Sequence, residues 1–282
     1  MKLGLSTPVV MQLPTVASAW EADATAADLA LVAAAADELG YDFLTCAEHV
    51  VVPAADAATR GDTYWDPAAT LGFLAAHTSR IRLATSVVVL GYHHPLQIAK
   101  QYGTLDRLSG GRVVLGVGVG SLEAEFTLLG APFEDRGARG DDAMRALRAA
   151  LSRREPSYEG RYYRFSGMSV NPWAQQSQLP MWVGGRTRRS LRRAVELGEG
   201  WMPFGLVPEA LRTMLQSVSL PTGFEVVLAT GRALDPGADP DGARRALDAL
   251  REAGATSATC TVAASSAQHY GDQLVRLQEL AS

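Results

Sequence analysis

The sequence predicts a closed (β/α)8 barrel, the TIM-barrel fold, with an irregular insertion before the fifth strand. Strand and helix signals alternate almost to the end of the 282-residue chain, a pattern typical of parallel α/β folds. A barrel of this type commonly takes about 250 residues. No boundary between domains is visible, so we expect residues 1–282 to form one domain. A doubly wound open sheet is the alternative, but it usually needs fewer strand–helix units or a second domain.

The first half of the chain is expected to contain four strand–helix units. The continuous β-branched run from Ile81 to Leu90 is typical of a parallel strand that is buried on both faces. In the first helix apolar residues recur at helical spacing, Asp28 suits the first turn, and Gly40 ends the helix. We place the strands at 2–6, 42–46, 81–90 and 112–121, and the helices at 25–39, 67–77, 95–108 and 136–151.

The insertion covers residues 156–179, where the alternation stops. Its aromatic side chains are expected to cover a face of the barrel. After it, the strand–helix rhythm returns for four more units. We place these strands at 180–183, 200–203, 224–230 and 256–262, and their helices at 187–197, 208–218, 241–253 and 267–280.

Composition and charge exclude several classes of protein. A net charge of −4 and a pI near 5.8 argue against a nucleic-acid-binding surface. No apolar run reaches the length of about 20 residues that a membrane span requires. The chain enters its first strand at Lys2, which leaves no room for a signal peptide. Cys46 and Cys260 fall within expected strands and are expected to be buried free thiols. We therefore expect a cytoplasmic protein without nucleic-acid or membrane partners.

A glycine-rich strand end marks the first candidate ligand site, because ligands of α/β folds bind at the carboxyl ends of strands. The segment Gly116–Ser121 is not a dinucleotide fingerprint, since Ser121 stands where the third glycine is required. We interpret its glycines as the place where the backbone approaches a flat cofactor. The alternative is that small residues ease the exit of the strand.

A second strand end predicts a phosphate site. The strand finishes at Gly184 and Gly185, and a helix begins directly afterwards. Free backbone N–H groups and the helix dipole favour an anion at such a turn, and Arg186 and Arg189 add positive charge. The alternative is a tight turn followed by an exposed basic helix face.

Glu48 and His49 follow the second strand and are the candidate catalytic residues, because a histidine beside a carboxylate suits proton transfer. We expect His94 to cap the helix that Pro95 opens. No metal is expected, since the first strand lacks a His-x-His pair. Serine-nucleophile elbows and Walker loops are missing too. Phosphate-site glycines without a hydrolytic constellation indicate a bound redox cofactor.

At these residues the chain resembles the luciferase-like monooxygenase superfamily, and most closely its branch that uses the deazaflavin coenzyme F420. The resemblance runs from the first strand to about Pro208, and the part after Leu220 matches poorly. Its strongest pieces are residues 81–90, 104–112, 116–126 and 182–185.

The resemblance implies a bulge in the third strand with a non-proline cis peptide at Ser86–Val87 behind the cofactor ring. It places Glu48 and His49 beside that ring, and it implies a homodimer formed through the early helices. Residues 50–65 are implied to cover the substrate, with Tyr64 and Trp65 as wall residues. The remaining cofactor residues that it implies are Val119, Gly120 and Ser121 at the ring and Gly184, Gly185, Arg186 and Arg189 at the phosphate.

One departure from the family bears on the reaction. Sugar-phosphate dehydrogenases of this superfamily carry a catalytic glutamate where this chain has Ser121. Sugar-phosphate oxidation is therefore disfavoured, although Glu123 and Glu125 lie close by.

We expect an oxidoreductase that transfers a hydride between coenzyme F420 and a small organic substrate, with His49 handling the proton. One alternative is an FMN-dependent monooxygenase that works with a separate reductase. Another is a non-catalytic flavin-binding barrel. A barrel aldolase or isomerase is disfavoured, because the only lysines, Lys2 and Lys100, are not at a carboxyl end of a strand.

Overall fold

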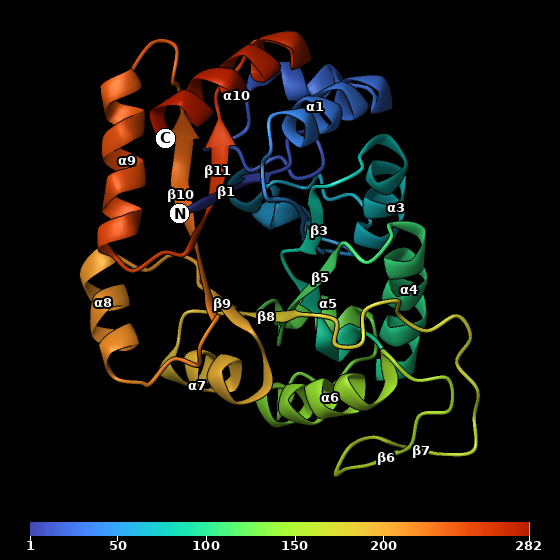
Figure 1. Ribbon diagram of the computed structural model, residues 1–282. Coiled ribbons are helices and arrows are strands. Elements are labelled where there is room, and N and C mark those ends of the chain that lie inside the picture. The colour runs from blue at the N-terminus through green and yellow to red at the C-terminus, as the bar shows by residue number, and fades with distance from the viewer. Residues whose placement is uncertain (282) are drawn as a thin grey trace.

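The computed structural model describes residues 1–281 and contains a closed parallel barrel (Figure 1). Nine strands form one sheet in the order β3-β2-β1-β11-β10-β9-β8-β5-β4, and a further pairing of β3 with β5 closes it. Both β3 and β4 pair with β5, one after the other along its length, so together they occupy one position in the barrel. The barrel therefore has eight strand positions, which confirms the predicted (β/α)8 fold. The strands are β1 Lys2–Ser6, β2 Phe43–Cys46, β3 Arg82–Thr85, β4 Val88–Val89, β5 Val113–Gly118, β8 Met181–Gly184, β9 Gly200–Met202, β10 Glu225–Leu234 and β11 Ser257–Val262.

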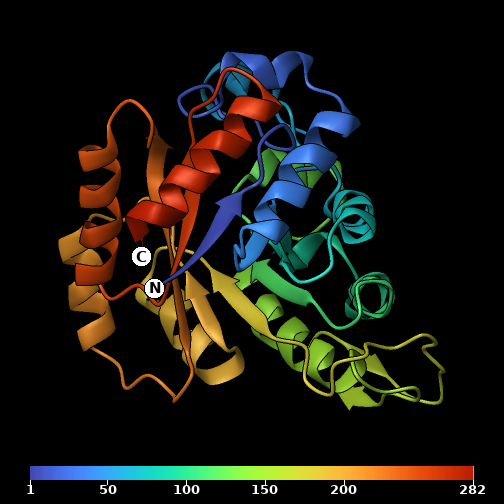
Figure 2. The same cartoon turned by 45° about the horizontal axis from the view of Figure 1, so that its top comes forward.

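Eight longer helices surround the barrel in both ribbon views (Figures 1 and 2). The first helix begins as predicted, because Thr25 caps it by accepting a hydrogen bond from Asp28 N while the Asp28 carboxylate accepts one from Thr25 N. The longer helices are α1 Ala26–Glu38, α3 Pro67–His77, α4 Pro95–Leu108, α6 Arg136–Ala150, α7 Arg188–Leu197, α8 Pro208–Gln216, α9 Pro240–Glu252 and α10 Ala267–Ala281. Short helices are η1 Ala19–Asp23, η2 Ala54–Asp56, α2 Ala57–Arg60, η3 Leu90–Tyr92 and α5 Glu123–Leu128.

Three strands differ from their predicted bounds by more than one residue. The run 81–90 is not one strand, because the chain leaves the sheet at a cis peptide between Ser86 and Val87 and returns as β4. The strand expected to reach residue 121 ends at Gly118, and α5, which the sequence did not predict, follows it. In contrast, β10 continues to Leu234 beyond a shift of register between Ala229 and Ala233.

Two aromatic rings are the largest side chains in the interior of the barrel. Phe43 and Trp182 are fully buried and pack edge to face, with ring centroids 5.1 Å apart. Glycines make room for them: a Cβ on Gly4 would lie 2.4 Å from the Phe43 ring, and one on Gly200 would lie 2.5 Å from Trp182 Cδ1. Small and large residues on neighbouring strands are therefore matched across the interior, as barrel cores require.

Charged side chains close the amino-terminal end of the barrel beneath these rings. The Arg82 guanidinium lies 5.0 Å from the Trp182 ring centroid and donates hydrogen bonds to the carboxylates of Asp42 and Glu225. Trp182 Nε1 donates to the same Glu225 carboxylate at 3.2 Å. Burial alone would raise the pKa of Glu225, but the hydrogen bonds and charge of Arg82, together with Lys2 and Trp182, hold that pKa below its usual value.

The insertion projects from the barrel between α6 and β8 (Figures 1 and 2). It contains a small antiparallel pair, β6 Tyr158–Glu159 and β7 Arg164–Phe165. Two carboxylates from the barrel helices hold it. Asp142 accepts hydrogen bonds from the Tyr158 hydroxyl (2.6 Å) and the backbone N–H of Tyr162 (2.7 Å), and the fully buried Asp106 accepts two backbone N–H groups from residues 175–176.

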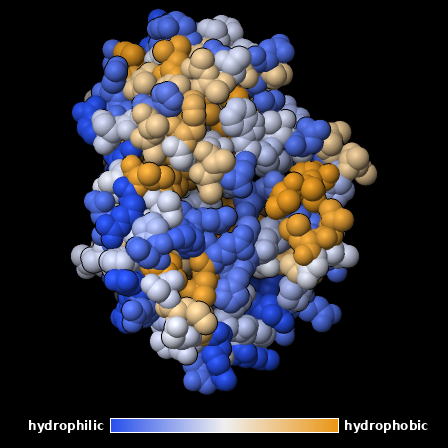
Figure 3. Space-filling view, turned by 90° about the vertical axis from the view of Figure 1, so that its right-hand side faces the viewer, coloured by the Kyte–Doolittle hydropathy of each residue, from blue (hydrophilic) through white to orange (hydrophobic). Residues whose placement is uncertain are grey.

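Figure 3 shows the face that lies on the right of Figure 1, where hydrophilic side chains surround separate groups of apolar ones. Within residues 1–281, no helix combines the length and the apolar character that crossing a membrane requires. Cys46 and Cys260 are buried free thiols, as predicted. Burial raises the pKa of each thiol to about 12.

Candidate active site

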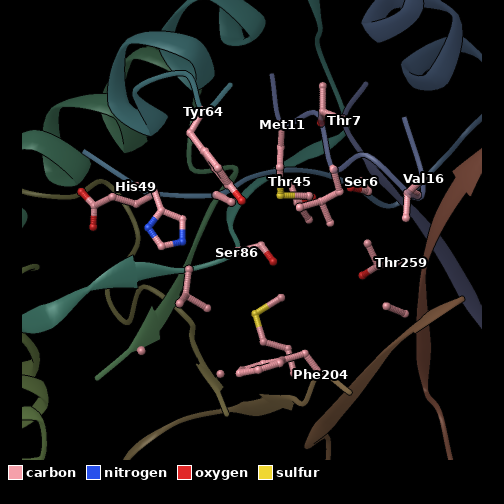
Figure 4. A pocket seen from close by; sticks show the side chains of 18 of the residues that line it. Ser6, Thr7, Met11, Val16, Thr45, His49, Tyr64, Ser86, Phe204 and Thr259 are labelled. Atoms are coloured by element: carbon pink, nitrogen blue, oxygen red, sulfur yellow. The ribbon is translucent and has the colours of Figure 1, made fainter. Parts of the chain in front are cut away.

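A cavity of about 500 Å³ opens at the carboxyl ends of the barrel strands. In Figure 4 the His49 imidazole lies at one end of this space, and Val16 and Thr259 lie toward the other. Met11 lies above the space and Phe204 below it. Every strand position of the barrel contributes to the lining, from Ser6 at the end of β1 to Thr261 in β11. The cavity therefore occupies the position where the sequence analysis expects a ligand.

Ten of the predicted site residues line this one cavity although they come from five separate segments. They are Glu48, His49, Tyr64, Ser86, Val87, Val119, Gly120, Ser121, Gly184 and Gly185.

Three further predicted residues are not part of the lining. Trp65 packs against the hydrophobic core instead. The Arg186 guanidinium lies 5.8 Å from the ring centroid of Phe204, a lining residue, so it lies next to the lining without forming part of it. Arg189 lies farther out, where its largely exposed guanidinium is 3.6 Å from the Asp141 carboxylate.

Several glycines in the lining make room for protein neighbours. A Cβ on Gly118 would lie 2.6 Å from Val87 Cγ2, and one on Gly184 would lie 2.8 Å from Val87 Cγ1. Gly120 has a φ of +75°, and a Cβ there would lie 2.5 Å from the Phe126 ring. These glycines let the Val87 side chain pack against β5 and β8, so that Ser86 and Val87 form part of the cavity wall.

The His49 imidazole is paired with a carboxylate that the sequence analysis did not assign to it. His49 Nδ1 lies 2.8 Å from Oε2 of Glu125, whose side chain is completely buried. The same carboxylate lies 2.7 Å from the Tyr92 hydroxyl and accepts hydrogen bonds from the backbone N–H groups of Val50 (2.6 Å) and Val51 (3.2 Å). Glu125 belongs to α5, a short helix that the sequence did not predict. Without that helix, nothing in the sequence indicated that the Glu125 side chain turns toward His49.

Glu48 pairs with a different histidine. Its carboxylate accepts a hydrogen bond from Val89 N (2.6 Å) and lies 2.7 Å from His93 Nε2. The hydrogen bond with Glu48 raises the pKa of His93 above its usual value of 6.5, because it outweighs the effect of burial. Although Glu48 and His49 are adjacent in sequence, each is thus paired with a residue from another segment of the chain. His94 caps α4 as predicted, accepting a hydrogen bond from Leu96 N.

An apolar wall comes from residues 7–24, between β1 and α1, which the sequence analysis did not include in the site. Met11, Leu13, Val16 and Ala17 all line the cavity. Glu21 stabilises this segment, since its buried carboxylate accepts hydrogen bonds from Val9 N (2.8 Å) and Ser18 N (2.7 Å). The unusual length of this connection was the signal available in the sequence.

Among the described residues that line the cavity, Arg60 is the one arginine or lysine. Arg60 is 44% exposed at its side chain and lies 3.7 Å from Asp56. Among residues 1–281, no group of three or more potential ligands has a metal-binding arrangement. The lining is therefore mostly apolar, with the hydroxyl groups of Ser6, Thr7, Thr45, Ser86, Thr259 and Thr261 among its polar contributions.

A barrel with a histidine and a mostly apolar cavity at the carboxyl ends of its strands is typical of enzymes that bind an organic cofactor. The family comparison agrees: the chain belongs to the luciferase-like monooxygenase family, whose model matches residues 1–220. This family includes oxidoreductases and monooxygenases. The match ends near Leu220, after which the resemblance in the sequence is also weak.

Curated relatives match part of the chain. An uncharacterised protein of Mycobacterium tuberculosis is 32% identical over 186 residues, which cover 61% of this chain and 66% of that protein. The 4-hydroxyprotoasukamycin monooxygenase of Streptomyces nodosus subsp. asukaensis is 30% identical over 199 residues, which cover 71% of this chain and 47% of the monooxygenase. The chain thus spans less than two thirds of the length of these relatives.

Solved structures share the fold along nearly the whole chain. The monooxygenase RslO1 from Streptomyces bottropensis has a TM-score of 0.79 at 21% identity and covers 99% of this chain and 98% of its own. The coenzyme F420-dependent tetrahydromethanopterin reductase from Methanopyrus kandleri has a TM-score of 0.74 at 16% identity, covering 98% and 97%. At these identities the likeness concerns the fold.

Proposed function

We propose that this protein is an oxidoreductase that transfers a hydride between coenzyme F420 and a small organic substrate. The observation that carries the proposal is the position of His49, which shares one cavity with Ser86, Val87 and the strand ends at Gly120 and Gly184. The F420-dependent reductase that shares the fold supports the choice of coenzyme.

The lining fits a flat, polar-edged cofactor. Ser86 and Val87 would hold the ring on one side, and Val119, Gly120 and Ser121 would hold it on another. Within the described chain, Thr7 Oγ1 is buried without a hydrogen-bond partner, and Thr7 is one of the lining residues. Buried hydroxyls normally have partners, so a polar group of a ligand is a suitable complement. When bound, the deazaflavin supplies the hydride-transfer chemistry.

The phosphate of the coenzyme would lie beside Gly184 and Gly185. In the turn that follows, Thr187 and Ser190 already satisfy each other's backbone N–H groups. Less of the helix terminus is then free for an anion than the sequence suggests. The side chains of Arg186 and Arg189 would therefore supply most of the positive charge.

His49 would exchange a proton with the substrate while the hydride moves. Among the described residues of the lining it is the one histidine, and the nearby carboxylate of Glu48 is already paired with Val89 N and His93. Glu48 would thus act by fixing the chain after the Ser86–Val87 segment, since Val89 N is its hydrogen-bond donor. A positioned general acid or base contributes about 10²–10⁴-fold to a rate.

The substrate is proposed to be uncharged and largely apolar. Met11, Leu13 and Val16 form one wall of the cavity, and Met202 and Phe204 line it as well. Placing a phosphate or carboxylate among these residues would remove it from water without a buried cation to pair with, which costs several kcal/mol. A sugar phosphate is therefore disfavoured, in agreement with Ser121 at the position where the sugar-phosphate dehydrogenases of the superfamily carry a catalytic glutamate.

Cofactor titration tests the proposal. We expect the purified protein to bind coenzyme F420, observed as a change in the deazaflavin fluorescence, and to bind FMN more weakly. The variant His49→Ala should bind F420 with similar affinity and lose at least about 10²-fold in turnover. Tight FMN binding without F420 binding would overturn the proposal, and full turnover of His49→Ala would remove its proton role.

The second candidate is an FMN-dependent monooxygenase that receives reduced flavin from a separate reductase. The 30% identity to 4-hydroxyprotoasukamycin monooxygenase favours it, and its cofactor would occupy the same residues. Reduced FMN would then support oxygen-dependent product formation, whereas an F420 oxidoreductase does not need oxygen.

A further inference from the structure

We infer that Glu125 is the positioning residue that holds the proton of neutral His49 on Nδ1 and leaves Nε2 to face the reacting group. The role of Nε2 in the reaction rests on the proposed function, whereas the position of the proton does not. Glu125 has not been placed in the site by the family resemblance, and it lies 76 residues from His49 in the sequence.

The surroundings of Glu125 make it an acceptor only. Its side chain is completely buried, and three donors and one imidazole nitrogen lie within hydrogen-bond distance of its two oxygens. Oε1 receives the backbone N–H groups of Val50 at 2.6 Å and Val51 at 3.2 Å. Oε2 lies 2.7 Å from the Tyr92 hydroxyl and 2.8 Å from His49 Nδ1. The two backbone N–H groups and the Tyr92 hydroxyl all donate, so both oxygens of Glu125 act as acceptors.

The proton of neutral His49 must then reside on Nδ1. The Tyr92 hydroxyl donates to Oε2, because burial and the neighbouring carboxylate raise the pKa of Tyr92 and keep the phenol protonated. The contact between Oε2 and His49 Nδ1 is therefore a hydrogen bond only if Nδ1 carries a hydrogen. In neutral imidazole the other nitrogen, Nε2, is then an acceptor.

Two contacts fix the direction in which Nε2 points. The bond to Glu125 sets the position of Nδ1, and the Tyr64 ring packs edge to face against the imidazole with centroids 4.6 Å apart. Among residues 1–281, no hydrogen-bond partner of His49 Nε2 is present, and His49 lines the cavity. The free nitrogen is thus available to a ligand.

The arrangement also accounts for both directions of proton transfer. A proton released by the substrate binds to Nε2, and the imidazolium that forms is stabilised by the Glu125 carboxylate. In the reverse direction the same Nε2–H returns the proton to the substrate. The Nδ1–H group stays hydrogen-bonded to Glu125 throughout, so the carboxylate orients the ring and takes no proton itself.

Nitrogen NMR of the cofactor-free protein tests the inference directly. The chain contains five histidines, and selective ¹⁵N labelling with the variant His49→Gln identifies the signals of His49. Above the pH at which the ring becomes neutral, we expect Nδ1 to be protonated and Nε2 to be unprotonated. The opposite pattern in the unmodified protein would overturn the inference, whatever any variant does.

The variant Glu125→Gln changes the donor pattern at nearly constant shape. Its amide oxygen can still accept from Val50 N, which turns the amide N–H2 toward His49 and makes Nδ1 the acceptor. We therefore expect the His49 proton to move to Nε2. Tyr92→Phe removes a neighbouring donor to the same oxygen and should leave the proton on Nδ1. An unchanged His49 pattern in a folded Glu125→Gln protein would also overturn the inference.

This experiment is independent of cofactor identity. A protein that fails to bind F420 but has Nδ1–H on His49 contradicts the proposed function and keeps the role of Glu125. A protein that binds F420 but carries the His49 proton on Nε2 supports the proposed coenzyme and contradicts the role of Glu125. Thermal unfolding of each variant, compared with that of the unmodified protein, shows whether it is folded.

Discussion

Removing the Phe43 ring should destabilise the whole barrel. The ring is fully buried and packs edge to face against Trp182. Its neighbours are strands of a closed sheet, so their backbones have little freedom to move into the space that Phe43→Ala leaves. The same layer includes Met202 and Val227, which also line the cavity. The variant therefore weakens the floor of the candidate active site as well.

The expected loss is about 4–5 kcal/mol. Phe→Ala substitutions in cores cost about 3–5 kcal/mol, and this site belongs in the upper part of that range because the ring is 0% exposed. The lost edge-to-face contact with Trp182 is included, at about 0.5–1.5 kcal/mol. Since domains are stable by about 5–15 kcal/mol, the variant should unfold at a much lower denaturant concentration.

Guanidinium unfolding, followed by circular dichroism and by fluorescence, measures the change. Phe204→Ala is the matched control, because it removes the same ring from a position that is 56% exposed, and it should cost less than about 1 kcal/mol. The reasoning is refuted if Phe43→Ala costs less than about 1 kcal/mol, or if the two variants lose equal stability.

Three further predictions concern pH, backbone packing and assembly. The pKa of His93 is raised by Glu48 above 6.5, so the stabilisation from this pair is complete at low pH and is lost as the pH rises through the folded-state pKa. Melting curves from about pH 6 to about pH 9 should thus fall more steeply for the unmodified protein than for His93→Gln, and parallel curves would contradict this. Gly116→Ala should cost at least about 3 kcal/mol, because its Cβ would lie 1.9 Å from the Thr85 carbonyl oxygen. Gly72→Ala, with no atom within 4 Å of its Cβ, should stabilise by about 0.5–1 kcal/mol in the same denaturant assay. The homodimer stays a prediction, and light scattering that gives the mass of one chain would contradict it.

Local signals in the sequence were sufficient for most of the fold. The bounds of α3 and α4 agree with the prediction because their starts carry strong signals, Asp66 before Pro67 and His94 before Pro95. By contrast, α5 is six residues long and has no side-chain cap. Its sequence therefore gave no reason to end the preceding strand at Gly118.

The site was predictable in its location and not in its internal pairing. Glycines and a histidine after strands indicate the carboxyl end of a barrel, and these residues do share one cavity. The hydrogen-bond partners of these residues could not be predicted, because Glu48 lies 45 residues from His93 and Glu125 lies 76 residues from His49 in the sequence. Adjacency in sequence suggested that Glu48 and His49 act together, whereas three-dimensional packing gives each a distant partner.

The way in which the barrel closes has a consequence for its synthesis. β1 pairs with β2 on one side and with β11 on the other, where Lys2 is opposite Ser257. While the ribosome is still making the residues before Ser257, one edge of β1 has no partner and the barrel remains open. Exposed strand edges bind other chains, so the nascent protein is vulnerable to aggregation until its last strand emerges. Substitutions that slow or weaken the pairing of β11 with β1 should therefore lower the yield of folded protein. Their effect on the stability of the protein that does fold should be smaller.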